Sequence, residues 1–306
     1  MLDRSAMKRL WMQPFTICSL GENLYEWLTA VGLGTQRGMS RKWCLWFREH
    51  IVLCRRYARA KIPGRRLWLF EPGWSLAPAM LARLVTDRGP LITEPRRRLA
   101  RRYVRSASAE VALAAEKICR SAGVPQVPRA LLDSMCAATS PRELVEMCEA
   151  EYQVGGLSEL ERLPESSVDI CMSMGRLEHF GESELRSLLC QMRRLLPPGG
   201  LGSHIVDHRD HFWHFDKSGH CFRHLTYSDE QWGAIAKGRK LYRNRLVESD
   251  YVRLFEDAGF EVLARVHELH RGDASGLNPE TLSGPYRKLS KEDIDAAVSH
   301  FIVRRQ

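Results

Sequence analysis

Short apolar runs separated by a segment of helical period dominate the middle of the chain. Val168–Met174 and Leu201–Val206 have the composition of buried strands, and the helix-like segment between them ends at a Pro-Pro-Gly-Gly turn at 197–200. A strand, a helix and a strand in this order predict a parallel βαβ unit. Because ligands of parallel sheets bind beyond the carboxyl ends of the strands, the residues after the two strands are the first functional candidates.

Carboxylate and imidazole side chains follow both of these strands. They are Glu178 and His179 after the first strand, and Asp207, His208, Asp210 and His211 after the second. Parallel neighbours end at the same edge of a sheet, so we expect these groups to lie together. Their convergence is the main reason to interpret the chain as an enzyme.

A similar pattern occurs earlier in the chain. The strand Leu67–Phe70 is followed by Glu71, a helix is predicted over Pro78–Val85, and the strand Leu91–Thr93 is followed by Glu94. The loop between the first strand and the helix contains a glycine. This is the layout of a nucleotide-binding half, in which glycine lets the backbone approach the ligand and the second acidic residue accepts hydrogen bonds from ribose hydroxyls.

Three further apolar runs complete the predicted sheet. They are Tyr152–Val154, Phe260–His267 and Val298–Val303, with helices predicted at 248–258 and 291–297. Alternation of strands with helical segments is typical of α/β domains. The prediction is a doubly wound, mostly parallel, seven-stranded sheet.

Two regions outside this pattern are predicted to be helical. Residues 1–62 form an N-terminal cap with helices around Leu24–Leu28 and Trp43–Tyr57, separated by Gly32, Gly34 and Gly38. A helical insert is expected at about 96–149 inside a sheet domain that spans 63–306. Glycine clusters between periodic segments mark such breaks.

Composition narrows the class of protein. The 306 residues are 44% hydrophobic and 27% charged, and no apolar run is long enough to span a bilayer. Nine cysteines are scattered without a CxxC pair, which favours reduced thiols and argues against a thiolate zinc site. We therefore expect a cytoplasmic protein that does not insert into a membrane.

The net charge of +9 raises the question of nucleic acid. Arginines supply most of the 46 basic residues, and the densest run is Arg96–Arg105. A basic stripe can bind RNA, but no aromatic-interleaved RNA motif accompanies this run. A solvated helix face is the favoured interpretation, and nucleic acid is not the expected partner.

A family resemblance rests on three stretches of the second half. LPESSVDICMSMGRLEHF at 163–180, RRLLPPGG at 193–200 and SHIVDHRDH at 203–211 match in kind, order and spacing. The chain resembles class I S-adenosylmethionine-dependent methyltransferases, in particular the branch with an LEH loop and a PGG turn. The resemblance is strongest over 163–303 and implies a Rossmann-like methyltransferase fold with S-adenosylmethionine as cofactor.

The chain departs from this family at the glycine-rich loop, which reads acidic-x-Gly-x-Gly-x-Gly there. With Glu71 as the acidic member, Gly73 is retained while Ser75 and Ala77 replace the other glycines. An alternative alignment on Gly-Trp-Ser places Leu69 at the acidic position. A loop of small residues still lets the backbone approach a ligand.

The resemblance also implies roles for individual residues. Those near the cofactor are Glu71, Gly73 and Trp74 at its amino-acid part, Glu94 at the ribose, Glu159 or Leu160 at the adenine, and Met174 with Gly175 beneath the sulfonium. Those that face the substrate are Glu178 and His179.

The predicted reaction is an in-line displacement at the sulfonium, for which the protein aligns the reactants and removes a proton. A histidine with a pKa near neutrality is a natural base. His179, His208 and His211 are the candidates, and Asp207 can orient an imidazole. The histidine spacing near 208–224 could chelate a metal, but no HExxH motif or thiolate pair supports this and no metal is expected.

The predicted function is methylation of a small molecule, and three alternatives remain open. The first keeps the cofactor but attacks its aminocarboxypropyl arm, by transfer of the arm or by ring closure to azetidine-2-carboxylate, and releases methylthioadenosine. The second is an RNA-modifying or RNA-binding protein that uses Arg96–Arg105. A binding module that has lost the cofactor is a third interpretation, and a homodimer is compatible with the sequence.

Overall fold

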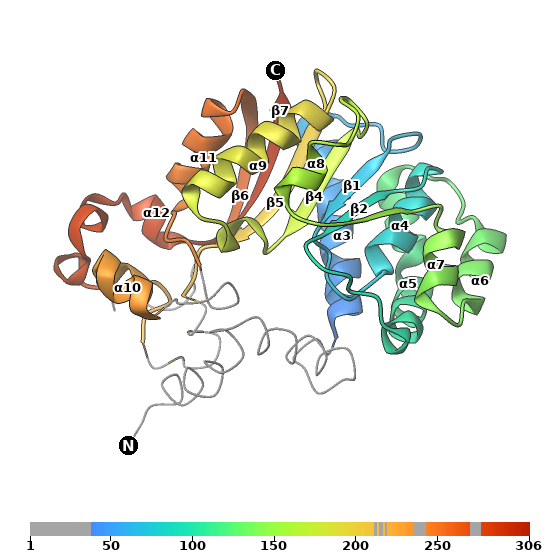
Figure 1. The fold of residues 1–306 in the computed structure, drawn as a ribbon, viewed down its shortest axis with the longest axis horizontal. Coiled ribbons are helices and arrows are strands. Elements are labelled where there is room, and N and C mark those ends of the chain that lie inside the picture. The colour runs from blue at the N-terminus through green and yellow to red at the C-terminus, as the bar shows by residue number, and fades with distance from the viewer. Residues whose placement is uncertain (1–37, 211–212, 214–216, 218, 236–242, 270–276) are drawn as a thin grey trace.

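The computed structural model describes residues 38–210, 213, 217, 219–235, 243–269 and 277–306. These residues form one seven-stranded sheet with the strand order β3-β2-β1-β4-β5-β7-β6 (Figure 1). The strands are β1 Leu67–Phe70, β2 Leu91–Glu94, β3 Glu151–Val154, β4 Ile170–Met174, β5 Leu201–Asp207, β6 Phe260–Leu269 and β7 Ala296–Arg305. The predicted doubly wound, mostly parallel sheet is therefore confirmed.

One strand of this sheet, β7, runs opposite to all the others. The pairs from β3 through β2, β1 and β4 to β5 are parallel, whereas β7 runs antiparallel to both β5 and β6. The carboxyl ends of the first five strands consequently lie at the same edge. The loops that follow β1, β2, β4 and β5 therefore begin at that edge of the sheet.

Helices cover both faces of the sheet because its side chains alternate between two apolar layers. Leu67 and Leu69 of β1 belong to one buried cluster, and Trp68 and Phe70 belong to the other. The first layer holds α3 (Met39–Ala58), α4 (Ala77–Thr86) and α5 (Arg101–Ala122). The second holds α9 (Glu182–Leu195) and α11 (Glu248–Asp257), which Figure 1 shows side by side.

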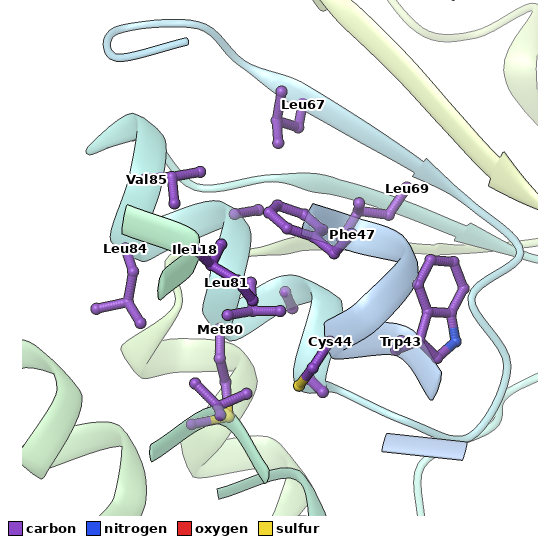
Figure 2. Packing of buried hydrophobic residues seen from close by; sticks show 14 of the residues in the cluster. Trp43, Cys44, Phe47, Leu67, Leu69, Met80, Leu81, Leu84, Val85 and Ile118 are labelled. Atoms are coloured by element: carbon purple, nitrogen blue, oxygen red, sulfur yellow. The ribbon is translucent and has the colours of Figure 1, made fainter. Parts of the chain in front are cut away.

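The packing of the first layer is seen in Figure 2. Phe47 from α3, Leu69 from β1, Leu81 from α4 and Ile118 from α5 are all at most 1% exposed and point toward one another. Burying one such side chain contributes roughly 1.5–3 kcal/mol. This shared core fixes α3 and α4 against the sheet, and both helices border the loop that follows β1.

The N-terminal region contributes directly to this layer. The expected helix around Leu24–Leu28 lies outside the described residues, and the second expected helix is α3. His50 on α3 places Nδ1 2.7 Å from Ser203 Oγ on β5, and Ser203 Oγ lies 2.8 Å from His300 Nε2 on β7. Burial lowers the pKa of His50 well below its usual value, so this contact is made by a neutral ring that docks α3 on the sheet.

The remaining helices lie around these layers. They are α6 Arg129–Ala137, α7 Pro141–Met147, α8 Leu157–Leu160, α10 Asp229–Ile235, α12 Lys291–Asp295, and the 3₁₀ helices η2 Leu177–His179, η4 Arg223–Thr226, η6 Pro279–Thr281 and η7 Gly284–Lys288. Of these, α6 and α7 pack with α5 in the region predicted as a helical insert at 96–149. The helix predicted to reach Ala297 ends at Asp295, because Ala296 already pairs with Leu269 of β6.

None of the helices in the described part of the chain is both long enough and apolar enough to cross a membrane. Within the same ranges, no group of three or more His, Cys, Asp or Glu side chains is arranged to hold a metal ion.

Candidate active site

The carboxyl ends of four parallel strands place charged residues along one edge of the sheet. Glu71 follows β1, Glu94 ends β2, Arg176 comes two residues after β4, and Asp207 ends β5. The strand order makes these strands consecutive neighbours. The structure therefore brings together residues that are up to 136 positions apart in the sequence.

The loop after β1 is held in an unusual backbone conformation. Glu71 has a φ of 48°, which is uncommon for a residue with a side chain, and its N–H donates to the carbonyl of Thr93 at 2.9 Å. Gly73 has a φ of 79°, and its N–H donates to the carboxylate of Glu94. A Cβ atom at Gly73 would meet no atom of the described residues within 4 Å, so the backbone there is open to a ligand.

Ser75 and Ala77, which replace two glycines of the family pattern, are both buried. Ser75 Oγ lies 3.0 Å from Ser40 Oγ on α3 and accepts the N–H of Ala77 at 3.2 Å. The hydroxyl therefore ties the loop to α3 where a glycine would leave space. Leu69, the acidic position in the alternative alignment, is a fully buried core residue of β1, so Glu71 is the acidic residue that follows the strand.

We expect Ser75→Ala to lower the free energy of unfolding by about 0.5–1.5 kcal/mol, because it removes a hydrogen bond between two buried hydroxyls. Chemical denaturation of the wild type and the variant measures this difference. Ser134→Ala is a suitable control, since Ser134 is exposed and donates only to the carbonyl of Ala130 in its own helix. An equal effect of the two substitutions would contradict the role given to Ser75.

Trp74 turns away from the open side of this loop. Its ring lies 5.7 Å from that of Tyr103 on α5, and its side chain is buried. The neighbouring carbonyl of Pro72 accepts a hydrogen bond from Trp43 Nε1 at 2.9 Å. Two tryptophans thus fix the position of the loop between α3 and α5.

Glu94 is a buried carboxylate at the end of β2. It is 1% exposed, accepts the N–H of Gly73 and pairs with Arg98 at 2.8 Å. Burial raises its pKa to about 7, against the opposing effect of the Arg98 and Arg176 guanidiniums. The Glu94 side chain is fully buried, with one carboxylate oxygen bonded to Gly73 and the other to Arg98.

The residues expected near an adenine follow β3. Leu160 on α8 is buried in the second apolar layer with Phe70, while Glu159 is partly exposed and pairs with Arg162 at 2.9 Å. The N–H of Gly155 donates to the Glu94 carbonyl at 2.8 Å, which joins this segment to the end of β2. Glu159 is therefore more accessible to a ligand than Leu160.

The turn after β4 continues the same edge. Met174 is 8% exposed, and Gly175 has a φ of 59° with its N–H bonded to the carbonyl of Ile205 at 2.8 Å. A Cβ atom at Gly175 would lie 3.3 Å from Glu178 Oε1. The Glu178 carboxylate consequently folds back over the end of β4.

Glu178 combines burial with an incomplete set of hydrogen bonds. It is 3% exposed, its Oε1 lies 3.4 Å from Arg243 Nη2, and its buried Oε2 has no hydrogen-bond partner among the described residues. Burial raises the pKa of this carboxyl to about 7, the Arg243 guanidinium lowers it, and the Asp207 charge raises it. A carboxylate with these properties is suited to accept a proton near neutral pH.

Arg243 links the ends of β4 and β5. Its side chain is 2% exposed, and Nη2 lies 3.4 Å from Glu178 and 3.6 Å from Asp207. Asp207 also accepts two hydrogen bonds from Arg209, from Nε at 2.9 Å and from Nη2 at 3.0 Å. Buried charges in proteins are stable only when paired in this manner.

Asn244 holds the loop that carries Glu178. Its Nδ2 donates to the carbonyls of Leu177 at 3.2 Å and Phe180 at 3.0 Å, and its N–H donates to the Glu178 carbonyl at 2.8 Å. Tyr251 Oη lies 2.9 Å from the same amide group. These contacts fix the backbone on both sides of Glu178.

The candidate histidines differ in their surroundings. His179 is partly buried in η2, next to Glu178, and its N–H donates to the carbonyl of Arg176 at 3.1 Å. His211 lies outside the described residues. His208 is 3% exposed, with Nδ1 3.3 Å from the carbonyl of Leu246 and Nε2 2.9 Å from Ser299 Oγ.

His208 is part of an internal network rather than of the open edge. Ser299 Oγ donates to Glu248 Oε1 at 2.7 Å, so His208 joins β5 to β7 and α11. Burial lowers the pKa of His208 to about 4. Its ring is therefore neutral at pH 7 and carries a single N–H, so it can donate to only one of these two partners at a time.

Sequence reasoning missed three residues that organise this edge: Arg176, Arg243 and Asn244. Arg176 forms an ion pair with Glu71 across the ends of β4 and β1. The sequence feature that could have identified Arg176 is its position directly after Gly175, the glycine that follows a buried strand. For Arg243 and Asn244 the corresponding feature is two adjacent polar residues shortly before an amphipathic helix. Such a pair is too common in sequences to identify a site.

Residues 108–203 match a family model described as a methyltransferase domain. This match agrees with the resemblance of the sequence to methyltransferases, for which S-adenosylmethionine is the expected cofactor. The matched range runs from within α5 into β5 and so includes the β4 turn and Glu178, whereas the roles of Glu71 and Glu94 rest on their places at the ends of β1 and β2.

Solved methyltransferase structures resemble the chain along most of its length. An S-adenosylmethionine-dependent methyltransferase from Mesorhizobium loti is 14% identical with a TM-score of 0.41, covering 82% of this chain and 95% of its own. A methyltransferase from Methanosarcina mazei is 12% identical with a TM-score of 0.40, and the match covers 79% of this chain and 92% of that protein. A methyltransferase from Archaeoglobus fulgidus is 11% identical with a TM-score of 0.41, and the match covers 84% of this chain and 94% of that protein. No curated protein matches the chain.

The residues present fit S-adenosylmethionine, the expected cofactor, in three respects. The backbone at Gly73 is open, Glu94 lies at the end of β2 where the resemblance expects the ribose, and Arg176 Nε is buried without a hydrogen-bond partner among the described residues. Glu71 and Arg176 are opposite in charge to the ammonium and the carboxylate of S-adenosylmethionine, respectively.

Proposed function

We propose that this methyltransferase acts on a small molecule and that Glu178 removes the proton from the attacking atom. The observation that carries this proposal is the buried Glu178 carboxylate beside Gly175, with a pKa of about 7 and an Oε2 atom that has no partner among the described residues. A base with a pKa near the working pH is the most effective one.

The cofactor would lie across the ends of β1, β2 and β4. Glu94 would hold the ribose hydroxyls, and the backbone at Gly73 would lie against the amino-acid part with Glu71 beside it. Glu159 would flank the adenine, and Met174 with Gly175 would lie beneath the sulfonium. Trp74 would support this arrangement from behind, since its ring packs on Tyr103.

When bound, the cofactor supplies a methyl group that is open to in-line attack. The chain's own part is to align the nucleophile and to take its proton. Asn244 holds the backbone at Glu178, and Arg243 holds the carboxylate, so that Oε2 is left for the substrate. His179 lies next to Glu178 and would contact the substrate from the same loop.

Glu178 is preferred to the histidines as the base for a geometric reason. His208 is buried with its ring nitrogens 3.3 Å from the Leu246 carbonyl and 2.9 Å from Ser299 Oγ, and burial lowers its pKa to about 4. Asp207 is held by Arg209 and Arg243. These two residues would therefore orient their neighbours rather than accept the substrate's proton.

A small-molecule substrate is favoured over RNA because part of the arginine-rich run contacts the protein itself. Arg98 turns inward to Glu94. Arg101 and Arg102 are exposed, but Arg101 Nε donates to the Thr139 carbonyl at 3.1 Å and the Arg102 guanidinium lies 5.1 Å from the Tyr103 ring centre. Near the end of β5, a separate apolar cluster that includes Cys221, Phe222 and Leu225 packs beside Asp210, whose N–H donates to the Cys221 carbonyl at 2.6 Å.

Label transfer tests this proposal. The protein is incubated with methyl-labelled S-adenosylmethionine and either a small-molecule cell extract or total RNA, and the products are identified by mass spectrometry. We expect S-adenosylhomocysteine, with label in the small-molecule fraction. Label confined to RNA would contradict the substrate class, and methylthioadenosine would instead show attack on the aminocarboxypropyl arm.

A further inference from the structure

The Arg176 guanidinium lies in the field of three carboxylates at this edge. Its pKa is raised by the charges of Glu71, Glu94 and Glu178, in that order, against the effect of burial. It pairs directly with Glu71, and its side chain is 26% exposed. The arginine therefore stands at the centre of the edge, within reach of a ligand that approaches over Gly175.

The hydrogen-bonding capacity of Arg176 is not exhausted by this ion pair. Nη2 donates to Glu71 Oε2, while the buried Nε has no hydrogen-bond partner among the described residues. An unsatisfied buried N–H costs free energy comparable to a lost hydrogen bond. A guanidinium presents its donors as a planar fork that matches a carboxylate.

The backbone of Glu71, the partner of Arg176 in this ion pair, is also held in one conformation. Its positive φ of 48° is a strained conformation, held by the hydrogen bond of its N–H to Thr93. The Glu71 side chain is 11% exposed. The pair thus offers one fixed anion and one fixed cation side by side, at the place where the family resemblance implies the amino-acid part of the cofactor.

We propose that Arg176 binds the α-carboxylate of S-adenosylmethionine, and that the cofactor enters by dividing the Glu71–Arg176 ion pair. The ammonium of the cofactor then takes the place of Arg176 at Glu71, and the carboxylate takes the place of Glu71 at Arg176. Two ion pairs replace one, and the unsatisfied Nε gains an acceptor. This inference rests on the proposed cofactor site and adds the residue that selects a ligand with an intact amino-acid arm.

Ligands that lack parts of this arm provide the test. S-adenosylhomocysteine has the whole arm, its decarboxylated analogue keeps only the amine, and methylthioadenosine has neither group. We expect calorimetric titration of Arg176→Gln to show an affinity for S-adenosylhomocysteine about 10–100-fold below that of the wild type, because a charge-assisted contact is lost. Affinities for the decarboxylated analogue and for methylthioadenosine should change by less than about threefold.

Two further variants make the test specific. Glu71→Gln should weaken both S-adenosylhomocysteine and the decarboxylated analogue and leave methylthioadenosine unchanged. Arg176→Lys keeps the charge but not the fork, and should recover part of the lost affinity.

Two results would overturn the inference. One is an equal loss for all three ligands in Arg176→Gln, and the other is no loss for any of them. Binding of methylthioadenosine by a variant also shows that it is folded. If the wild type bound none of the three ligands, the proposed cofactor site itself would be wrong, which is a different outcome from failure of Arg176 alone.

Discussion

Glu178→Gln is expected to lower kcat by about 10²–10⁴-fold, because an amide cannot accept the proton that a positioned carboxylate removes. Gln keeps the size of the side chain and can still contact Arg243, so the loop should retain its position. The measurement is steady-state turnover at saturating S-adenosylmethionine with the substrate identified by label transfer. Affinity for S-adenosylhomocysteine should stay within about threefold of the wild type.

The pH profile separates a base from a residue that only maintains the structure. Burial raises the pKa of Glu178 to about 7, so the carboxyl is neutral and inactive below that pH. The kcat of the wild type should therefore rise with pH through about 7, and the profile of Glu178→Gln should be flat over the same range. Glu182→Gln is the control, since Glu182 is exposed and pairs only with Arg186 in the described part of the chain. A rising limb that survives in Glu178→Gln would assign the proton to another group.

Arg243→Leu is expected to cause the largest loss of stability, about 3–5 kcal/mol. Removal of Arg243 leaves the buried Glu178 without its paired charge, whereas Asp207 keeps its ion pair with Arg209. At ~2–4 °C per kcal/mol in domains of similar size, the Tm should fall by about 6–20 °C. Denaturation in urea and thermal unfolding both measure this change.

Arg186→Leu is the matched control for this substitution. Arg186 also contacts two carboxylates, at 3.0 Å from both Glu182 and Asp257, but its side chain is 50% exposed. Exposed ion pairs contribute about 0–1 kcal/mol. If the two arginine variants lost the same stability, burial would not be the reason that Arg243 matters.

The sheet could be predicted from the sequence because its strands are short apolar runs between clear stop signals. Leu67–Phe70 was placed without error, and the run Val168–Met174 contains all of β4. Each run lies between a helical segment and a turn, so local sequence alone was enough to identify it as a strand. The end of the last helix was misplaced by two residues, since the pairing of Ala296 with β6 depends on tertiary structure.

The candidate site could be predicted only in part. The positions of Glu71, Glu94 and Glu178 followed from strand ends, which are local features. The part played by Arg243 did not, since it depends on a loop 65 residues away that brings its guanidinium to Glu178. The burial that changes the pKa of His208 also arises from contacts with β7 and α11, which no local pattern encodes.

Hydrogen–deuterium exchange with and without S-adenosylhomocysteine tests the central claim most directly, because it locates the bound ligand along the chain without any substrate. The account predicts that binding slows exchange in three segments together: the loop after β1 at 71–75, the end of β2 near Glu94, and the turn after β4 at 174–178. Protection confined to other parts of the chain, or no protection at saturating ligand, would contradict the placement of the cofactor at this edge of the sheet.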